Sequence, residues 1–171
     1  MKRAVLIVLL LTLAVPCLAF GQAQTAPPPK PGPEVQPLGY WVGTWKYEAT
    51  KSSSIFTCEW FTGGFTLMCR GEGTNASGKF SNLQLMTYDS GAKAYTIHMA
   101  SSTEAGLFVA AGSLAGSTWT WDWTGTFDGK PAKYHRTIVQ VSPTSATSKI
   151  ERSVDGGPWT VTGEATYTKV K

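Results

Sequence analysis

The residues best suited to chemistry in this sequence are two cysteines, which bracket the segment CEWFTGGFTLMC from Cys58 to Cys69. Two isolated thiols lack the other two ligands of a tetrahedral metal site, and both histidines are remote in sequence. A redox pair usually has C-x-x-C spacing and a helix N-terminus to lower a thiol pKa, and neither is present. Counting outward from a two-residue Gly63-Gly64 loop, Cys58 lies opposite Cys69, at a separation that a disulfide can bridge. We therefore predict a disulfide and no metal site.

The register of this hairpin also predicts which of its side chains face inward. Successive side chains of a strand point to opposite faces, and one face of this hairpin is apolar. That face carries Phe56, Cys58, Trp60, Phe65, Leu67 and Cys69. On the opposite face Glu59 lies diagonal to Arg70, where the two charges can pair. A two-residue loop also makes the two cysteines a hydrogen-bonded pair of the ladder.

Three tryptophans form a second cluster, in the segment STWTWDWTG. The period of two places Trp119, Trp121 and Trp123 on one face of a strand and polar residues on the other. These indoles either fill the interior, line an apolar cavity, or form an outward aromatic ladder for sugars or partners. In a cavity each indole also offers an N–H that orients a ligand.

The two histidines occupy strand-like segments. We expect His98 to face outward, because Ile97 and the other alternate residues take the more apolar face. We expect His135 to face inward near one rim, since it shares a face with Val139 and Val141. The sequence contains no nucleophile elbow, paired-carboxylate site or H-E-x-x-H motif, so we predict structural histidines and no catalytic residue.

Short alternating segments separated by turn residues predict an all-β fold. After Pro37 no segment has a sustained helical period, and Gly, Asp-Gly and Ser-Gly punctuate the chain. The predicted strands cover residues 40–50, 54–62, 65–74, 79–89, 94–102, 106–114, 117–127, 133–142, 146–153 and 158–169. Short connections join antiparallel neighbours, and a long meander removes its exposed edges by closing on itself. We therefore predict an up-and-down antiparallel barrel of about ten strands.

The beginning of the chain has the pattern of a targeting sequence. Residues 1–21 combine a charged start, an apolar run and small residues, which indicates a secretory signal peptide. A retained membrane anchor and a lipidated Cys17 are the alternatives. Residues 22–37 are rich in proline and predict a disordered linker, which makes residues 38–171 one domain. We expect an exported protein, periplasmic or secreted, in an oxidising environment where cysteines pair.

The charge composition argues against a nucleic-acid partner. Without Lys2 and Arg3, 13 of the 15 lysines and arginines remain against 11 acidic residues, and the positive charges are scattered. We also expect no stable membrane insertion once the signal peptide is removed, and no cofactor.

Four segments together carry a resemblance to a known family. Residues 39–46 read GYWVGTWK and contain Gly43-Thr44-Trp45, and the other segments are EWFTGGF, MTYDSGAKAYT and RSVDGGPWTVTGEATYTK. In order and spacing they resemble bacterial secreted lipocalin-like (calycin-type) barrel proteins of unknown function. The G-x-W of residues 43–45 is similar to the motif that opens the first strand of lipocalin-like barrels.

The resemblance implies a closed or nearly closed barrel with one cavity. It further implies that Gly43 and Trp45 have a structural role at the closed end of the barrel, with Arg152 or Lys169 covering the indole. Barrels of similar shape that bind haem use a histidine near the C-terminus. No histidine follows His135, so the resemblance implies no haem cofactor here.

Three functions remain open from the sequence. The first is a non-enzymatic barrel that binds a small, mostly apolar molecule in its interior. The second is a structural or interaction protein with a filled barrel, and the third is an enzyme that uses His135 and a nearby carboxylate. For the first function, the predicted ligand-binding residues are Trp60, Phe65, Leu67, Trp119, Trp121, Trp123 and His135. Room for a ligand inside the barrel distinguishes the first function from the second.

Overall fold

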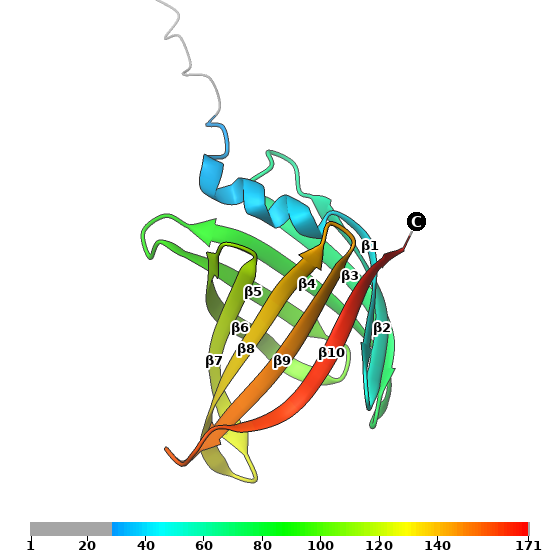
Figure 1. Cartoon of the computed structure of the whole chain (residues 1–171), viewed down its shortest axis with the longest axis vertical. Helices are drawn as coiled ribbons and strands as arrows, with labels where there is room; N and C mark the ends of the chain where they lie inside the picture. The colour runs from blue at the N-terminus through cyan, green and yellow to red at the C-terminus, as the bar shows by residue number, and fades with distance from the viewer. Residues whose placement is uncertain (1–28, 171) are drawn as a thin grey trace, which may run out of the picture.

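The computed structural model describes residues 29–170 and contains one closed antiparallel barrel preceded by a short helix (Figure 1). The barrel is closed because β1 pairs with β10 as well as with β2. Each other strand pairs with its neighbours in the chain, so the predicted up-and-down barrel is confirmed. The elements are η1 (Pro33–Trp41), β1 (Gly43–Ala49), β2 (Ser52–Trp60), β3 (Thr66–Asn75), β4 (Gly78–Asp89), β5 (Ala94–Ser101), β6 (Glu104–Ala115), β7 (Thr118–Phe127), β8 (Lys130–Ser142), β9 (Ser145–Val154) and β10 (Thr160–Val170).

Helix η1 differs from the sequence-based prediction, which assigned residues 33–37 to a disordered linker and residues 40–42 to a strand. Both assignments are wrong, because Val35, Leu38 and Trp41 are buried side chains of a 3-10 helix. Their spacing matches the roughly three residues per turn of such a helix, so all three lie on one face. The folded domain therefore begins before residue 38.

One end of the barrel is covered by η1, and we call it the capped end (Figure 1). Hydrogen bonds fix both ends of the helix to the barrel. The buried Trp45 indole N–H donates to the carbonyl oxygen of Trp41 over 2.9 Å. Near the start of the helix, the Tyr95 hydroxyl donates to the carbonyl oxygen of Glu34 over 2.8 Å. The helix is therefore part of the core.

The predicted disulfide between Cys58 and Cys69 is present and joins β2 to β3. The turn is longer than predicted, because the Phe61 N–H donates to the Thr66 carbonyl oxygen over 2.8 Å. Hydrogen-bonded and non-hydrogen-bonded residue pairs alternate along an antiparallel ladder. Cys58 and Cys69 lie three pairs along from the hydrogen-bonded Phe61–Thr66 pair, so they form a non-hydrogen-bonded pair. The prediction of a hydrogen-bonded pair was wrong. The closer spacing of a non-hydrogen-bonded pair agrees with the 4.0 Å between the two Cα atoms.

The predicted signal peptide, residues 1–21, and the linker residues 22–28 lie outside the described part of the chain. Within residues 29–170, no helix has the length and apolar character needed to cross a membrane.

Removing the disulfide by the double substitution Cys58→Ser and Cys69→Ser should lower the free energy of unfolding by about 3 kcal/mol, because the unfolded chain regains the entropy of the closed loop. Urea unfolding of the two proteins measures the difference. A reductant should destabilise the wild-type protein by a similar amount and leave the variant unchanged. Labelling of both wild-type cysteines by an alkylating agent, without reductant, would contradict the prediction.

Candidate functional site

The interior of the barrel contains a cavity of about 370 Å³. Sites for small molecules have volumes of about 300–1,000 Å³, so the cavity is large enough for a ligand. Most of its wall is apolar, with a few polar side chains. The lining residues are Trp41, Tyr47, Ser54, Phe56, Cys69, Phe80, Asn82, Gln84, Met86, Ile97, Met99, Phe108, Ala110, Trp121, Trp123, Arg136, Ile138, Ile150 and Tyr167.

The cavity is closed at one end and more accessible at the other. Trp41 of η1 forms part of its wall at the capped end. Along β4, the inward residue Met86 is buried, whereas Gln84, Asn82 and Phe80 are progressively farther from η1 and only half-buried. The cavity is therefore more accessible from the end opposite η1, which we call the open end.

Two of the three clustered tryptophans, Trp121 and Trp123, line the cavity. Trp121 lies close to β6 because its partner across the strands is Gly112, where a Cβ atom would lie only 2.5 Å from the indole ring. Trp123 stacks on Tyr134, with ring centroids 5.1 Å apart. These rings give the β7 wall a rigid apolar surface.

Three other predicted ligand-binding residues, Trp60, Leu67 and Trp119, do not line the cavity. Leu67 and Trp119 are fully buried, and half-buried Trp60 packs against the same core cluster. This cluster also contains the buried face of η1, which occupies the capped end of the barrel. The sequence analysis placed a ligand beside these residues, but the structure places the helix there.

The remaining two, Phe65 and His135, do not line the cavity, contrary to expectation. Phe65 lies in the turn before β3 and is 39% exposed. His135 is on the outer face because the next residue, Arg136, lines the cavity and strand neighbours point to opposite sides. His98 is exposed, as predicted.

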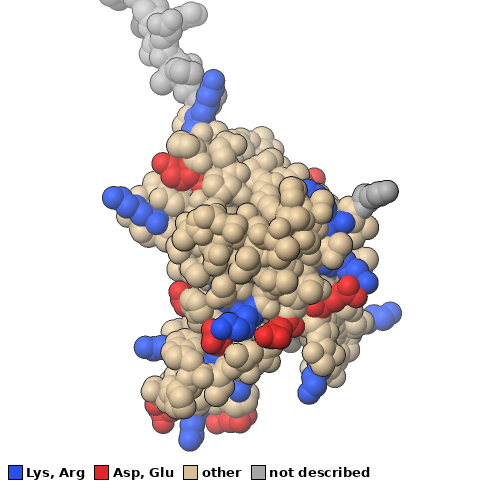
Figure 2. Space-filling view, viewed as in Figure 1, with Lys and Arg blue, Asp and Glu red and all other residues tan. Residues whose placement is uncertain are grey.

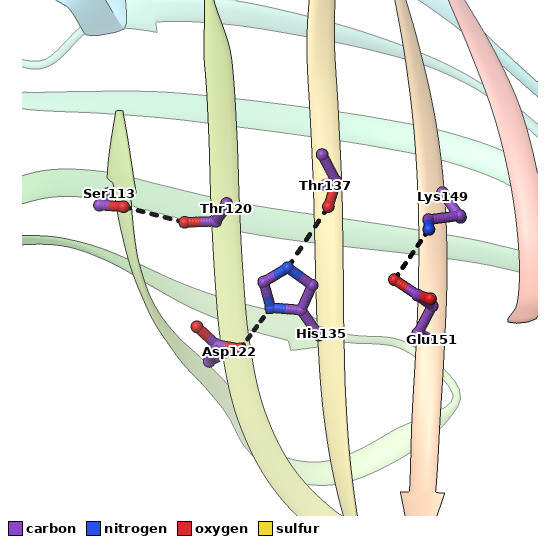
Figure 3. Close-up of polar contacts among 7 residues, drawn as sticks. All are labelled: Ser113, Thr120, Asp122, His135, Thr137, Lys149 and Glu151. Atoms are coloured by element: carbon purple, nitrogen blue, oxygen red, sulfur yellow. Dashed lines mark hydrogen bonds and ion pairs between the residues drawn. The ribbon is translucent and has the colours of Figure 1, made fainter. Parts of the chain in front are cut away.

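On the outer face, His135 forms a chain of polar contacts (Figure 3). Its Nδ1 lies 2.6 Å from Oδ1 of Asp122, and its Nε2 lies 3.3 Å from the Thr137 hydroxyl. A ring that donates from Nδ1 to Asp122 can accept from Thr137 at Nε2. This order is that of an acid–base relay, but the three side chains stand on the outside of the sheet and none lines the interior cavity.

The principal polar group of the cavity is the Arg136 guanidinium, which the sequence did not identify. Its Nη2 donates to the hydroxyls of Tyr167 and Ser148, the latter over 3.4 Å. Its Cζ lies 5.9 Å from the ring centre of Tyr47 and 5.6 Å from that of Tyr167. Its Nε is buried and has no hydrogen-bond acceptor within residues 29–170.

Burial raises the pKa of Tyr167, which opposes the smaller lowering effect of the nearby Arg136 charge. The hydroxyl therefore stays protonated at neutral pH. It accepts a hydrogen bond from Arg136 as a neutral group, so it leaves the positive charge of the guanidinium unbalanced.

A turn signal in the sequence could have located Arg136. Asp128 and Gly129 have φ values of 50° and 75°, as a two-residue turn of type I′ requires. Counting outward from this Asp-Gly pair places Trp121 opposite Arg136, which is the observed register. An inward Trp121 then requires an inward Arg136. The sequence-based prediction began this strand at residue 133, after the turn. It then assigned the face of Val139 and Val141 to the interior, which placed Arg136 outside.

Trp45 is fully buried in the core at the capped end. The cation that covers it is Lys169, whose Nζ lies 5.4 Å from the ring centre. Arg152, the other candidate, instead lies over the Phe127 ring at 3.3 Å. Gly43, two residues before Trp45, has a φ of 108° at the start of β1, which favours glycine.

The described residues form no metal-binding cluster, and one face of the molecule carries charges of both signs. Within residues 29–170, no group of three or more histidine, cysteine or acidic side chains is placed to hold a metal ion. On the face seen in Figure 2, basic and acidic side chains are interspersed around a large uncharged area.

Comparisons with known proteins identify the fold and a family. Residues 30–169 match the family described as "Protein of unknown function (DUF1579)". The crystal structure of Rv2717c from M. tuberculosis is similar with a TM-score of 0.54 and 14% identity, over 83% of this chain and 100% of that chain. An S-type phycobiliprotein lyase, CPES from Guillardia theta, gives a TM-score of 0.49 and 12% identity, over 80% of this chain and 92% of that one. No curated protein sequence matches the chain.

The buried tyrosine makes stability dependent on alkaline pH. Because the pKa of Tyr167 is raised in the folded protein, the unfolded chain loses this proton first as the pH rises above the ordinary value of 10.0. The stabilising contribution is therefore fully present below pH 10 and is lost as the pH rises toward the folded-state pKa. Urea unfolding across this range should show a steeper loss of stability for the wild-type protein than for Tyr167→Phe. Equal slopes would contradict the prediction.

Proposed function

Because this chain belongs to the DUF1579 family of proteins of unknown function, we propose a function from its own geometry: the barrel binds a small, mostly apolar molecule in its interior. The observation that carries this proposal is the cavity of about 370 Å³ inside a closed barrel. Binding would remove the apolar surface of the ligand from water, which is favourable in proportion to the area buried.

The shape of the cavity supports binding in its interior. At the capped end, η1 keeps solvent away from the deepest part of the cavity, where Trp41 and Met86 are buried. At the open end, the half-buried Asn82 and Gln84 offer amide groups that can orient a ligand. An apolar wall with a few polar groups is the usual composition of a small-molecule site.

The two alternative functions have less support. A structural protein with a filled barrel does not need an interior cavity of this size. An enzyme based on His135 and Asp122 would have to act on the outer face of the sheet, away from the cavity. The proposal is therefore a binding protein without catalytic residues or a resident cofactor.

We also propose that the protein is exported to the periplasm or secreted. The signal-peptide pattern of residues 1–21 supports export, and so does the Cys58–Cys69 disulfide, since disulfides persist in oxidising compartments. The proposed partner is thus a small molecule met outside the cytoplasm, and neither a nucleic acid nor a stable association with a membrane is proposed.

The cavity can be tested with N-phenyl-naphthylamine, an uncharged apolar fluorophore. It should gain fluorescence on binding and quench Trp121 and Trp123 by energy transfer. Ala110→Phe should abolish both signals, because this buried alanine lines the cavity. Ala111→Phe is the matched control, since the adjacent residue is exposed on the other face of β6 and should leave binding intact.

Native mass spectrometry of protein purified from its own host would show a bound molecule directly. Circular dichroism and thermal unfolding establish that both variants are folded. A wild-type protein that is empty, and whose tryptophan emission does not respond to the fluorophore or to a panel of lipids and aromatic compounds, would contradict the proposed function.

A further inference from the structure

We propose that the ligand of this cavity is an anionic amphiphile, with a carboxylate head that Arg136 binds and an apolar body that fills the rest of the space. This inference rests on the proposed function and specifies the chemical class of the ligand. It is carried by an inward guanidinium whose charge and hydrogen-bonding capacity are only partly satisfied by the protein.

Arg136 is held in the wall of the cavity by the register of the barrel. It lies on β8 between Trp121 of β7 and Ile150 of β9, and all three side chains line the cavity. The rings of Tyr47 and Tyr167 lie within 6 Å of its Cζ and restrict the guanidinium to this position. The cation is therefore preorganised before any ligand arrives.

The hydrogen bonds of Arg136 leave part of its donor capacity free. An arginine has five N–H donors in a planar fork. Both hydrogen bonds to protein acceptors, the hydroxyls of Tyr167 and Ser148, come from Nη2. Nε is buried without an acceptor among the described residues. Nε of Arg152 and Nε1 of Trp119 are also buried without partners among these residues, but of the three side chains only Arg136 lines the cavity. The unused donors of Arg136 are therefore the ones beside a bound molecule, and buried polar groups normally have partners.

The charge of Arg136 is also unbalanced within the barrel. Among the described residues, none that lines the cavity is acidic. The ion pairs found within residues 29–170 join side chains on the outer face: Lys46–Glu48, Arg70–Glu59, His135–Asp122 and Lys149–Glu151. A partly buried charge is costly unless it is paired, and a carboxylate matches both the charge and the fork of the guanidinium.

The rest of the cavity suits the apolar body of such a ligand. Elsewhere in the cavity wall, β4 and β5 present Met86, Ile97 and Met99. Methionine side chains adapt to irregular shapes, so this wall can accept a flexible chain or a ring. The other inward arginine, Arg152, lies over the Phe127 ring and does not line the cavity, which leaves Arg136 as the anchor.

The test compares dodecanoate with dodecanol, two ligands that share a chain and differ in the head group. Each is titrated against wild-type protein carrying bound N-phenyl-naphthylamine, and displacement gives the dissociation constant. We expect dodecanoate to bind at least about tenfold more tightly than dodecanol, because its head group can accept a charge-assisted hydrogen bond from Arg136. In Arg136→Gln this preference should disappear, while binding of dodecanol and of the fluorophore persists.

Three variants identify the source of the preference. Arg136→Lys keeps the charge but loses the fork, and should retain part of the preference. Arg136→Glu should reverse it, so that dodecylammonium binds more tightly than dodecanoate. Arg70→Gln removes a positive charge from the outer face of β3, and it should leave the preference unchanged.

The outcomes separate the inference from the proposed function. If the fluorophore and dodecanol bind but dodecanoate has no advantage in the wild-type protein, the assignment of an anionic head is wrong and the binding function stands. An advantage that survives in Arg136→Gln, or that is lost equally in Arg70→Gln, also overturns the role of Arg136. If neither the fluorophore nor either dodecyl ligand binds the wild-type protein, the proposed function itself fails.

Discussion

The pairing of β1 with β10 is the constraint on which the rest of the structure depends. This ladder pairs the first and last strands of the chain and runs from the Thr44–Val170 pair to the Ala49–Ala165 pair. With this ladder in place, the sheet has no unpaired edge, and each strand must direct alternate side chains to a shared interior. The register of each hairpin then decides which residues meet inside the barrel. The lining of the cavity and the outward position of His135 follow from that alternation.

Closure also explains why the interior is divided into a packed end and an empty middle. The largest buried side chains, including Trp45 and Trp119, gather with η1 at the capped end. Farther along the barrel the inward positions include small residues such as Ala110, and the opposite walls are not bridged by side chains. The stability of the fold can therefore come from one end, which leaves the middle free for a ligand.

The same alternation places the two most reactive side chains of β8 on opposite faces of the sheet. His135 points outward and finds Asp122 on the neighbouring strand, where water and salt weaken the electrostatic interaction. Arg136 points inward, where few groups compete for its charge and where the described part of the chain offers no acceptor to its Nε. A polar group inside a mostly apolar cavity has a stronger influence on what binds there than an exposed group does. The interior of the barrel is therefore where we place the specificity of this protein.

The sequence by itself determined most of the strand structure of this protein. Alternating apolar residues and turn signals were enough to predict ten strands, the barrel and the disulfide between Cys58 and Cys69, because these depend on short-range periodicity and on counting across one turn. The same periodicity correctly placed Trp121 and Trp123 on the inward face.

Only the tertiary structure decided what lies beside those residues. The 3-10 helix is held at the capped end because Val35, Leu38 and Trp41 are buried against the barrel. The proline-rich sequence of this segment does not predict that contact. Trp60 and Leu67 pack in the same core cluster as this helix and do not line the cavity. The inward position of Arg136 depends on the register between β7 and β8. The hydrophobic pattern of β8 predicts the opposite face, because it assigns charged residues to the outside. Periodicity shows which face a side chain takes, but its partners across the barrel depend on how all ten strands close.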